Sequence, residues 1–212
     1  MSKRNKIRDP YNVIGDFFSF ASLNQQRKYI SSMLKAAYSE DYWRKSEPGE
    51  LLFFQQRMRD LINATHLFVS GKKNKKVRRK TAMVEKGAIN HMIDPATYFG
   101  RHQGDSMWVF FPRYLSGKEF INPYFAIEKF FAFKSLDEWM GDLDELISYA
   151  LSSYGNESAL EFDYLKINIL LQKLVEASHL IHVRVNKPVA YDASCINITE
   201  NQQVVTSCNK RK

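Results

Sequence analysis

Apolar residues recur along this chain at the three- and four-residue spacing of amphipathic helices, first within residues 9–70 and again within 122–186. The first stretch predicts a short helix from Pro10, a second helix after Ser22, and a third from about Glu50 to Ser70. The second stretch predicts the same series: a short helix from Pro123, a second helix after Ser135, and a third from about Leu160 to Val183.

The two stretches match each other without a gap at an offset of 113 positions. Between Asp9 and Val69, 15 of 61 residues are identical to their counterparts in Asn122 to His182. The identities include prolines, phenylalanines, serines and the histidines His66 and His179. A chance similarity between two leucine-rich helical segments would not produce identities of these residue types. The pattern therefore predicts an internal duplication.

Both copies carry the same signals for starting helices. A side chain that can act as an N-cap precedes a proline at the first helical position, in Asp9–Pro10 and in Asn122–Pro123. A serine followed three positions later by Gln or Glu predicts a capping box, in Ser22/Gln25 and in Ser135/Glu138.

A three-helix unit of this size has a marginal core of its own. We therefore expect a mainly all-α fold in which two such units form a six-helix bundle about a pseudo-two-fold axis. The predicted organisation is a basic N-terminal arm (1–8), helical repeat 1 (9–70), a basic and aromatic linker (71–121), helical repeat 2 (122–186) and a flexible polar tail (187–212).

The apolar residues of the linker have no helical period, and part of the linker is predicted to form β-structure. Residues 107–111 are aromatic and β-branched, Ser116–Gly117 can make a turn, and Lys118–Ile121 follows, so this region predicts a short β-hairpin. A connection of this length in a compact protein is usually functional or disordered.

Composition narrows the class of protein. The apolar content of 44% suffices for a core without disulfides, and Cys195 and Cys208 both lie in the predicted tail, which favours reduced thiols. No stretch resembles a signal peptide or approaches the length of a membrane span. We expect a cytoplasmic protein; no motif predicts a cofactor, and the oligomeric state is left open.

The net charge of +8 is concentrated in a few segments, above all in the run from Lys72 to Lys80. Its seven cations are Lys72, Lys73, Lys75, Lys76, Arg78, Arg79 and Lys80. Such a run can displace counterions from a phosphate backbone and so bind RNA or DNA without regard to sequence, with Arg101 and Arg113 adding contacts. Two alternatives to nucleic-acid binding are a solvated loop that only keeps the protein soluble and a segment that binds an anionic membrane surface.

Arg59 and His66 are separated by six residues near the end of the first long predicted helix. This pattern resembles the arginine–histidine signature of HEPN-type ribonucleases, and Asp60 matches the polar residue that often follows the arginine. The resemblance implies His66 as general base and Arg59 as phosphate stabiliser. Gln172 replaces the arginine in the second copy, so only one motif is complete.

The remaining histidines suggest two further hypotheses. His66 and His179 could form a paired site across the pseudo-two-fold axis, or they could be packing residues that the ancestral unit needed. In the linker, a His-x-x-Asp spacing occurs twice, in His91/Asp94 and in His102/Asp105, and could hold a divalent ion.

Together these patterns favour a non-enzymatic helical binding or adaptor protein that contacts nucleic acid through the basic run. A metal-independent, HEPN-like ribonuclease using Arg59 and His66 is one alternative. A scaffold that docks a protein partner through aromatic linker residues, such as Trp108 or Phe110, is the other.

Overall fold

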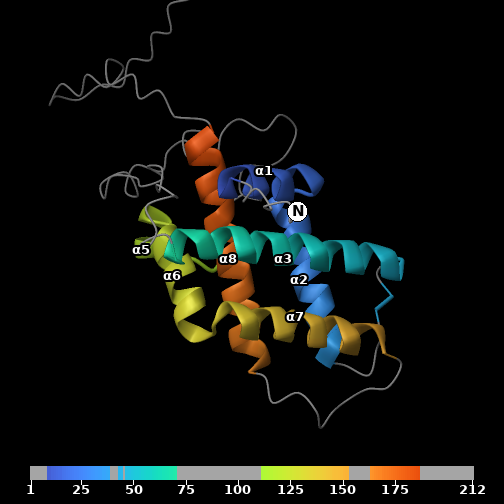
Figure 1. Ribbon diagram of the computed structural model, residues 1–212. Helices are drawn as coiled ribbons and strands as arrows, with labels where there is room; N and C mark the ends of the chain where they lie inside the picture. The colour runs from blue at the N-terminus through green and yellow to red at the C-terminus, as the bar shows by residue number, and fades with distance from the viewer. Residues whose placement is uncertain (1–8, 39–42, 45, 71–110, 153–162, 187–212) are drawn as a thin grey trace, which may run out of the picture.

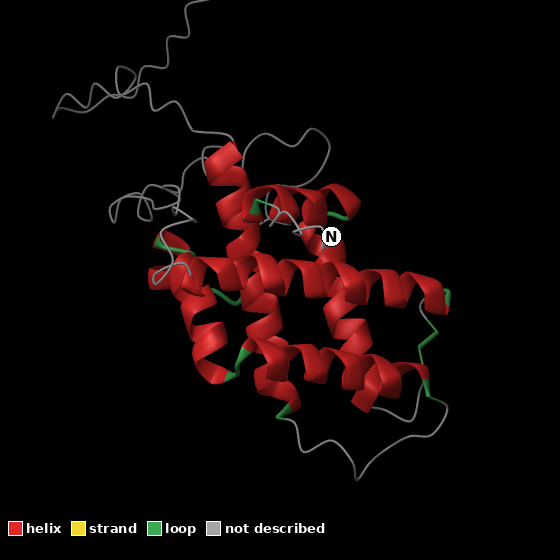
Figure 2. Ribbon diagram, in the orientation of Figure 1, coloured by secondary structure: helices red, strands yellow, loops and turns green. Residues whose placement is uncertain are grey.

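Seven α-helices and their connections make up the described part of the computed structural model, which comprises residues 9–38, 43–44, 46–70, 111–152 and 163–186. No strand occurs in these residues (Figure 2). The prediction of a mainly helical fold is thus confirmed. The helices are α1 (Pro10–Phe20), α2 (Leu23–Tyr38), α3 (Pro48–Ser70), α5 (Gly117–Ile121), α6 (Tyr124–Phe133), α7 (Leu136–Leu151) and α8 (Tyr164–Asn186).

The four long helices form two crossed layers (Figure 1). Helices α3 and α7 pack against each other in one layer, and α2 and α8 pack against each other in the other, while α2 also contacts α7. The short helix α1 lies on α3 and α8, and α6 lies on α8 and α3. Helices from both predicted halves therefore pack on each other throughout.

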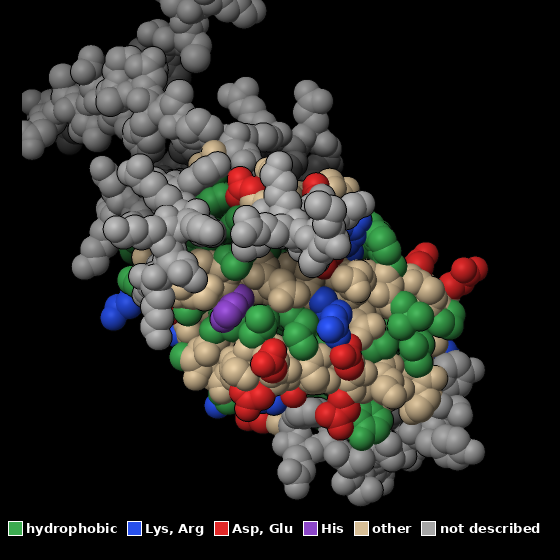
Figure 3. All heavy atoms as spheres, viewed as in Figure 1, with side chains coloured by type: hydrophobic (Ala, Val, Ile, Leu, Met, Phe, Trp, Pro, Cys, Tyr) green, Lys and Arg blue, Asp and Glu red, His purple; other side chains and the backbone are tan. Residues whose placement is uncertain are grey.

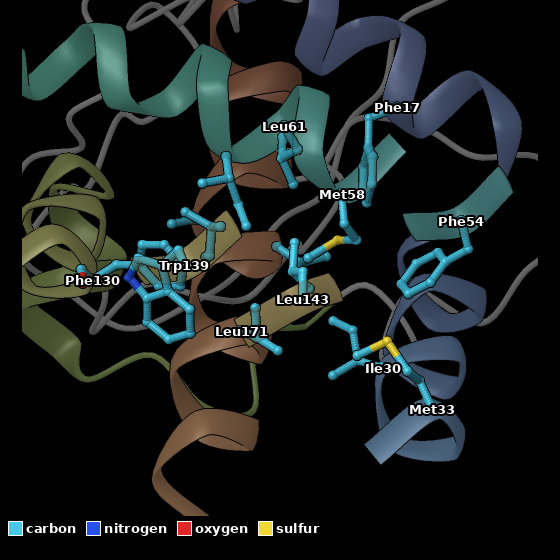
Figure 4. Packing of buried hydrophobic residues seen from close by; sticks show 14 of the residues in the cluster. Phe17, Ile30, Met33, Phe54, Met58, Leu61, Phe130, Trp139, Leu143 and Leu171 are labelled. Carbon is cyan, nitrogen blue, oxygen red and sulfur yellow. Dashed lines mark hydrogen bonds between the residues drawn. The ribbon is translucent and has the colours of Figure 1, made fainter. Parts of the chain in front are cut away.

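One continuous core results from this packing. Its fully buried side chains come from both halves and include Phe17, Met58, Phe130, Trp139 and Leu171 (Figure 4). At another point in the core the hydroxyls of Tyr11 and Tyr124 lie 3.0 Å apart in a buried hydrogen bond. Full burial of each large apolar side chain is worth about 1.5–3 kcal/mol, so these long-range contacts dominate the stability.

Helix α1 begins at Pro10 with Asp9 as its N-cap, as predicted, whereas α6 begins at Tyr124 with Pro123 as its N-cap and α8 begins at Tyr164 rather than at about Leu160. The Asp9 carboxylate accepts a hydrogen bond from the Tyr11 backbone N–H (3.1 Å), and the Asn122 side chain accepts one from that of Tyr124 (3.2 Å). Both predicted capping boxes are present, reciprocally between Ser22 and Gln25 and between Ser135 and Glu138. The Asp9 cap and the two capping boxes form as predicted because their side chains satisfy backbone donors that the first turn leaves open.

The ends of α1 and α6 are closed by side chains from the following helices. The Gln26 amide donates to the carbonyl oxygen of Phe17 (3.0 Å), and the Trp139 indole N–H donates to that of Phe130 (3.1 Å). Both carbonyls belong to a last helical turn, where no intrahelical donor is available. A buried amide and a buried indole thus perform the same task 113 positions apart.

The predicted hairpin is wrong where it can be examined. Lys118–Ile121, predicted as its second strand, lies in helix α5, and Ser116 is not a turn residue but the N-cap of that helix. Glu119 completes a capping box with Ser116, a local hydrogen-bond pattern that outweighs the β-propensity of the following Phe120 and Ile121. Residues 107–110 of the first strand lie outside the described residues.

Within the described ranges, no helix is both long and apolar enough to cross a membrane.

Candidate functional site

Arg59 and His66 both lie on α3, but they engage different neighbours. Arg59 forms an ion pair with Asp144 of α7, which also accepts a hydrogen bond from Gln55 (2.7 Å). His66 lies seven positions after Arg59 on the helix, a rise of about 10 Å. The ion pair therefore draws the guanidinium toward α7, and the structure does not bring it to the imidazole.

His66 and His179, the histidines predicted to be equivalent, each pack on a phenylalanine of the other predicted half. The His66 ring lies 5.0 Å from that of Phe131, and the His179 ring lies 5.1 Å from that of Phe18, both in edge-on geometry. The interplanar angles are 62° and 74°. This arrangement supports the packing interpretation of the pair over a shared catalytic or metal site.

His66 also borders an open pocket at the junction of α1, α3 and α7. The pocket has a volume of about 330 Å³ and is lined by Val13, Asp60, Asn63, Ala64, His66, Leu67 and Leu136. Its polar groups are one carboxylate, one amide and one imidazole on an otherwise apolar wall. We call it the α1–α3 pocket.

The remaining candidates from the sequence fall in two groups. The run Lys72–Lys80, Arg101 and the metal candidates His91, Asp94, His102 and Asp105 lie outside the described residues. Arg113 is described, and its side chain is exposed. In the part of the chain that the structure describes, no group of three or more His, Cys, Asp or Glu is placed to hold a metal ion.

A buried clamp fixes residues 111–115, which begin the described range 111–152, to α2 and α8. The carboxylate of Glu176, on α8, is 0% exposed and accepts from Nε (3.0 Å) and Nη2 (2.5 Å) of Arg27, on α2. It also accepts from three consecutive backbone N–H groups, those of Arg113, Tyr114 and Leu115. Arg27 in turn donates to the carbonyl of Phe111 (2.7 Å).

The clamp is electrostatically demanding because it places charges inside the protein. Burial lowers the pKa of Arg27 from its ordinary value, and the Glu176 carboxylate opposes that effect. Glu176 supplies the negative charge that compensates the buried guanidinium, and removing either partner would leave the other charge uncompensated inside the protein. The pair therefore ties residues 111–115 to α2 and α8. One end of the segment that carries the basic run is therefore firmly anchored.

A second buried carboxylate, that of Glu119 on α5, is held between two lysines. It accepts from Lys129 of α6 (2.8 Å), from Lys173 of α8 (2.8 Å) and from the backbone N–H of Ser116. Burial, the largest influence, raises the pKa of Glu119, but the combined hydrogen bonds from Lys129, Lys173 and Ser116 lower it to about 2. We refer to this group as the Glu119 cluster.

The Glu119 cluster predicts a specific acid sensitivity. Because the folded-state pKa lies below the ordinary value of 4.5, the carboxylate contributes stability that is fully present above about pH 4.5. That contribution is lost as pH falls through the folded pKa of about 2. Chemical denaturation of the intact protein and of Glu119→Gln between pH 6 and 2.5 should show the stability difference shrinking toward low pH. A difference that stays constant over this range would contradict the assignment.

The exposed charges of the helical body are mostly acidic on one face. Figure 3 shows acidic side chains gathered over α7, where Asp137, Glu138, Asp144 and Glu145 are exposed. Among all described residues, 14 Asp and Glu oppose 13 Lys and Arg. The positive excess of the chain therefore comes from segments outside the described residues.

The sequence did not single out Glu119, Arg27 or Glu176. For Glu176 a signal existed, because a glutamate stands between Val175 and Ala177 on the apolar side of a predicted helix. For Arg27 no signal existed, since its partner lies 149 residues away.

No family model matches this chain, and comparisons with curated proteins and with solved structures give no match.

Proposed function

We propose that this protein is a duplicated helical scaffold that binds nucleic acid, without regard to sequence, through the basic run Lys72–Lys80. The observation that carries the proposal is the separation of charge. The described helical body is nearly neutral and acidic over α7, whereas the basic run places seven cations in nine positions. A phosphate backbone would be repelled by the α7 face and attracted by the run.

The buried clamp supports the same proposal from the structural side. A segment that served only as a passive connection would not need a fully buried ion pair at its boundary, because such pairs rarely add net stability. Arg27 and Glu176 instead fix residues 111–115, and Arg113 is exposed within this segment. A cation next to a fixed anchor could extend the phosphate-binding surface of the run.

Several structural correspondences support the duplication that the proposal includes. Helices α2 and α7 are each 16 residues long and start 113 positions apart, and the buried Tyr11–Tyr124 hydrogen bond joins equivalent positions. The packing of α1 on α3 corresponds to that of α6 on α8, and α2 on α8 corresponds to α7 on α3. Exchanging the halves thus reproduces the helix contacts.

The direct test is fluorescence anisotropy with short labelled RNA and DNA, single- and double-stranded. We expect micromolar binding by the intact protein, in the range of sequence-independent interactions. Replacing the seven cations of the basic run with glutamine should weaken it about tenfold or more, because each lost phosphate contact removes a counterion-release contribution. The same samples run on a denaturing gel report any cleavage, which would favour the ribonuclease alternative.

A matched pair of variants separates the effect of the basic run on affinity from the effect of total net charge. One carries Lys72→Gln, Lys75→Gln and Lys76→Gln, and the other carries three glutamines at the exposed body positions Lys28, Lys35 and Lys118. Both lose three charges, but only the first should lose affinity appreciably. Equal losses would mean that total charge, not the run, governs binding. Absence of binding by the intact protein would contradict the proposal. The alternative to examine next would be a protein partner that docks through Trp108 or Phe110.

A further inference from the structure

Exposed apolar side chains meet where the end of α1 lies against the first turns of α3. Phe53 is 43% exposed, and its neighbour Leu52 and Phe20 of α1 are exposed as well. The rings of Phe20 and Phe53 touch edge-on, with centroids 4.8 Å apart and an interplanar angle of 76°. Figure 3 shows hydrophobic side chains gathered at this end of α3. We call Phe20, Leu52 and Phe53 the Phe53 patch.

Covering the Phe20 ring does not by itself require an aromatic side chain at position 53. At the offset of 113, Phe20 corresponds to Phe133 and Phe53 to Lys166. The Lys166 ammonium lies over the Phe133 ring, 4.0 Å from its centroid, so a lysine covers that ring while its charge stays near water. Phe53 instead adds exposed aromatic surface next to Phe20. Contiguous apolar surface of this kind is a feature of interaction sites.

Opposite charges flank Phe53 along α3. Glu50 precedes it by one helical turn and Arg57 follows it by one, so the three residues share one side of the helix. Glu50 is exposed and accepts a long hydrogen bond (3.4 Å) from the Tyr29 hydroxyl. The Arg57 guanidinium lies over the Phe53 ring, 4.9 Å from its centroid. Within the described ranges, the buried Nε of Arg57 has no hydrogen-bond acceptor.

This surface is complementary to itself. Phe53 stands close to midway between Glu50 and Arg57, so a two-fold axis beside Phe53 relates each of these charges to the opposite one on a second copy. Two α3 helices packed antiparallel about that axis form two attractive Glu50–Arg57 pairs, with the apolar side chains of both copies between them. Parallel packing would instead place Glu50 against Glu50. The order of the charges therefore favours the antiparallel arrangement.

We propose that the Phe53 patch is the contact surface of a homodimer, in which a second copy of this chain packs antiparallel on α3 and Glu50 of each copy pairs with Arg57 of the other. The inference goes beyond nucleic-acid binding and does not depend on it. A contact centred on one end of a helix is smaller than the roughly 800 Å² per partner of a standard interface. We therefore expect a weak dimer, with a Kd of roughly 10–100 μM.

Analytical ultracentrifugation without nucleic acid, from about 5 to 500 μM protein, tests the dimer on both sides of the expected Kd. The intact protein should shift from monomer toward dimer mass over this range. Phe53→Asp should weaken association about tenfold or more, because it places carboxylates at the apolar centre of the contact. The matched control is Leu165→Asp, at the exposed leucine predicted to be equivalent to Leu52, and it should associate like the intact protein. A monomer at every concentration, or an equal loss in the control, would overturn the proposal.

A mixing experiment tests the antiparallel pairing itself. Glu50→Arg and Arg57→Glu should each abolish self-association, because each sets like charges against each other at both pairs. A Glu50→Arg copy is positive at both positions and an Arg57→Glu copy is negative at both. An equimolar mixture of the two should therefore form a mixed dimer with a Kd within about threefold of that of the intact protein. Absence of the mixed dimer would overturn the pairing. No variant touches the basic run, so loss of dimerisation and loss of nucleic-acid binding are measured separately.

Discussion

Glu176→Gln is expected to lower the free energy of unfolding by about 3–5 kcal/mol, since removing one partner of a buried ion pair leaves the other charge uncompensated. Arg27 is only 5% exposed, so water cannot take over the role of the carboxylate. The loss should exceed that of a simple pair, because Glu176 also accepts from three backbone N–H groups of residues 113–115. A neutral amide presents a single acceptor oxygen to these five donor contacts.

Equilibrium urea unfolding followed by circular dichroism measures this loss. The control is Asp144→Asn, which breaks the partly exposed ion pair with Arg59 and should cost no more than about 1 kcal/mol. Limited proteolysis should also show faster cleavage near residues 111–115 in Glu176→Gln than in the control. Equal stability losses in the two variants would contradict the interpretation of Glu176 as the centre of a buried clamp.

Trp139→Ala is expected to cost about 3–5 kcal/mol, the range for deleting a large aromatic side chain from a core. The indole is fully buried and stacks on Phe130, with ring centroids 4.0 Å apart and an interplanar angle of 7°. It also satisfies the Phe130 carbonyl at the end of α6. Its loss opens a cavity and removes a helix-end hydrogen bond at once.

Trp139→Phe separates these two contributions, since it keeps a ring in the stack but has no N–H to donate. We expect a smaller loss, of about 1–3 kcal/mol, for an unsatisfied buried carbonyl together with the smaller ring. Phe125→Ala, at an aromatic position that is 44% exposed, serves as the control and should change stability little. The same urea titrations apply, and a Trp139→Ala variant as stable as the control would refute the assigned core role.

The sequence predicts the features that depend on neighbours along the chain. The spacing along the chain is sufficient to predict the two capping boxes and the Asp9 N-cap, because each operates within three residues: Ser22 with Gln25, Ser135 with Glu138, and Asp9 with Tyr11. The apolar stripes likewise predict which side of each long helix is buried. Helix α5 was not predicted, because its aromatic and β-branched residues favour a strand. Its N-terminal capping box favours a helix, and the structure shows that the capping box prevails.

The features that the sequence could not predict depend on crossings between helices. Arg59 and His66 have a suggestive spacing on one helix, yet α7 supplies Asp144 to the first and α6 supplies Phe131 to the second. The clamp joins residues 149 positions apart, which no local pattern encodes. The Glu119 cluster likewise joins Glu119 to Lys173, 54 positions away.

The proposed role of the basic run follows from how charge is distributed in the chain. The described helical body carries nearly equal numbers of acidic and basic side chains, whereas the run Lys72–Lys80 holds seven cations in nine positions. We therefore expect salt to weaken nucleic-acid binding mainly through the run.

The salt dependence of single-stranded RNA binding tests this central claim most directly. The intact protein should lose affinity steeply between about 50 and 200 mM salt, with a slope in log–log form of roughly −0.7 for each phosphate contacted. The variant with glutamine at the seven cations of the run should bind more weakly and show a much smaller slope, because only the contacts of Arg101 and Arg113 remain. Identical slopes for the two proteins would contradict the claim, because the phosphate contacts would then lie elsewhere on the chain.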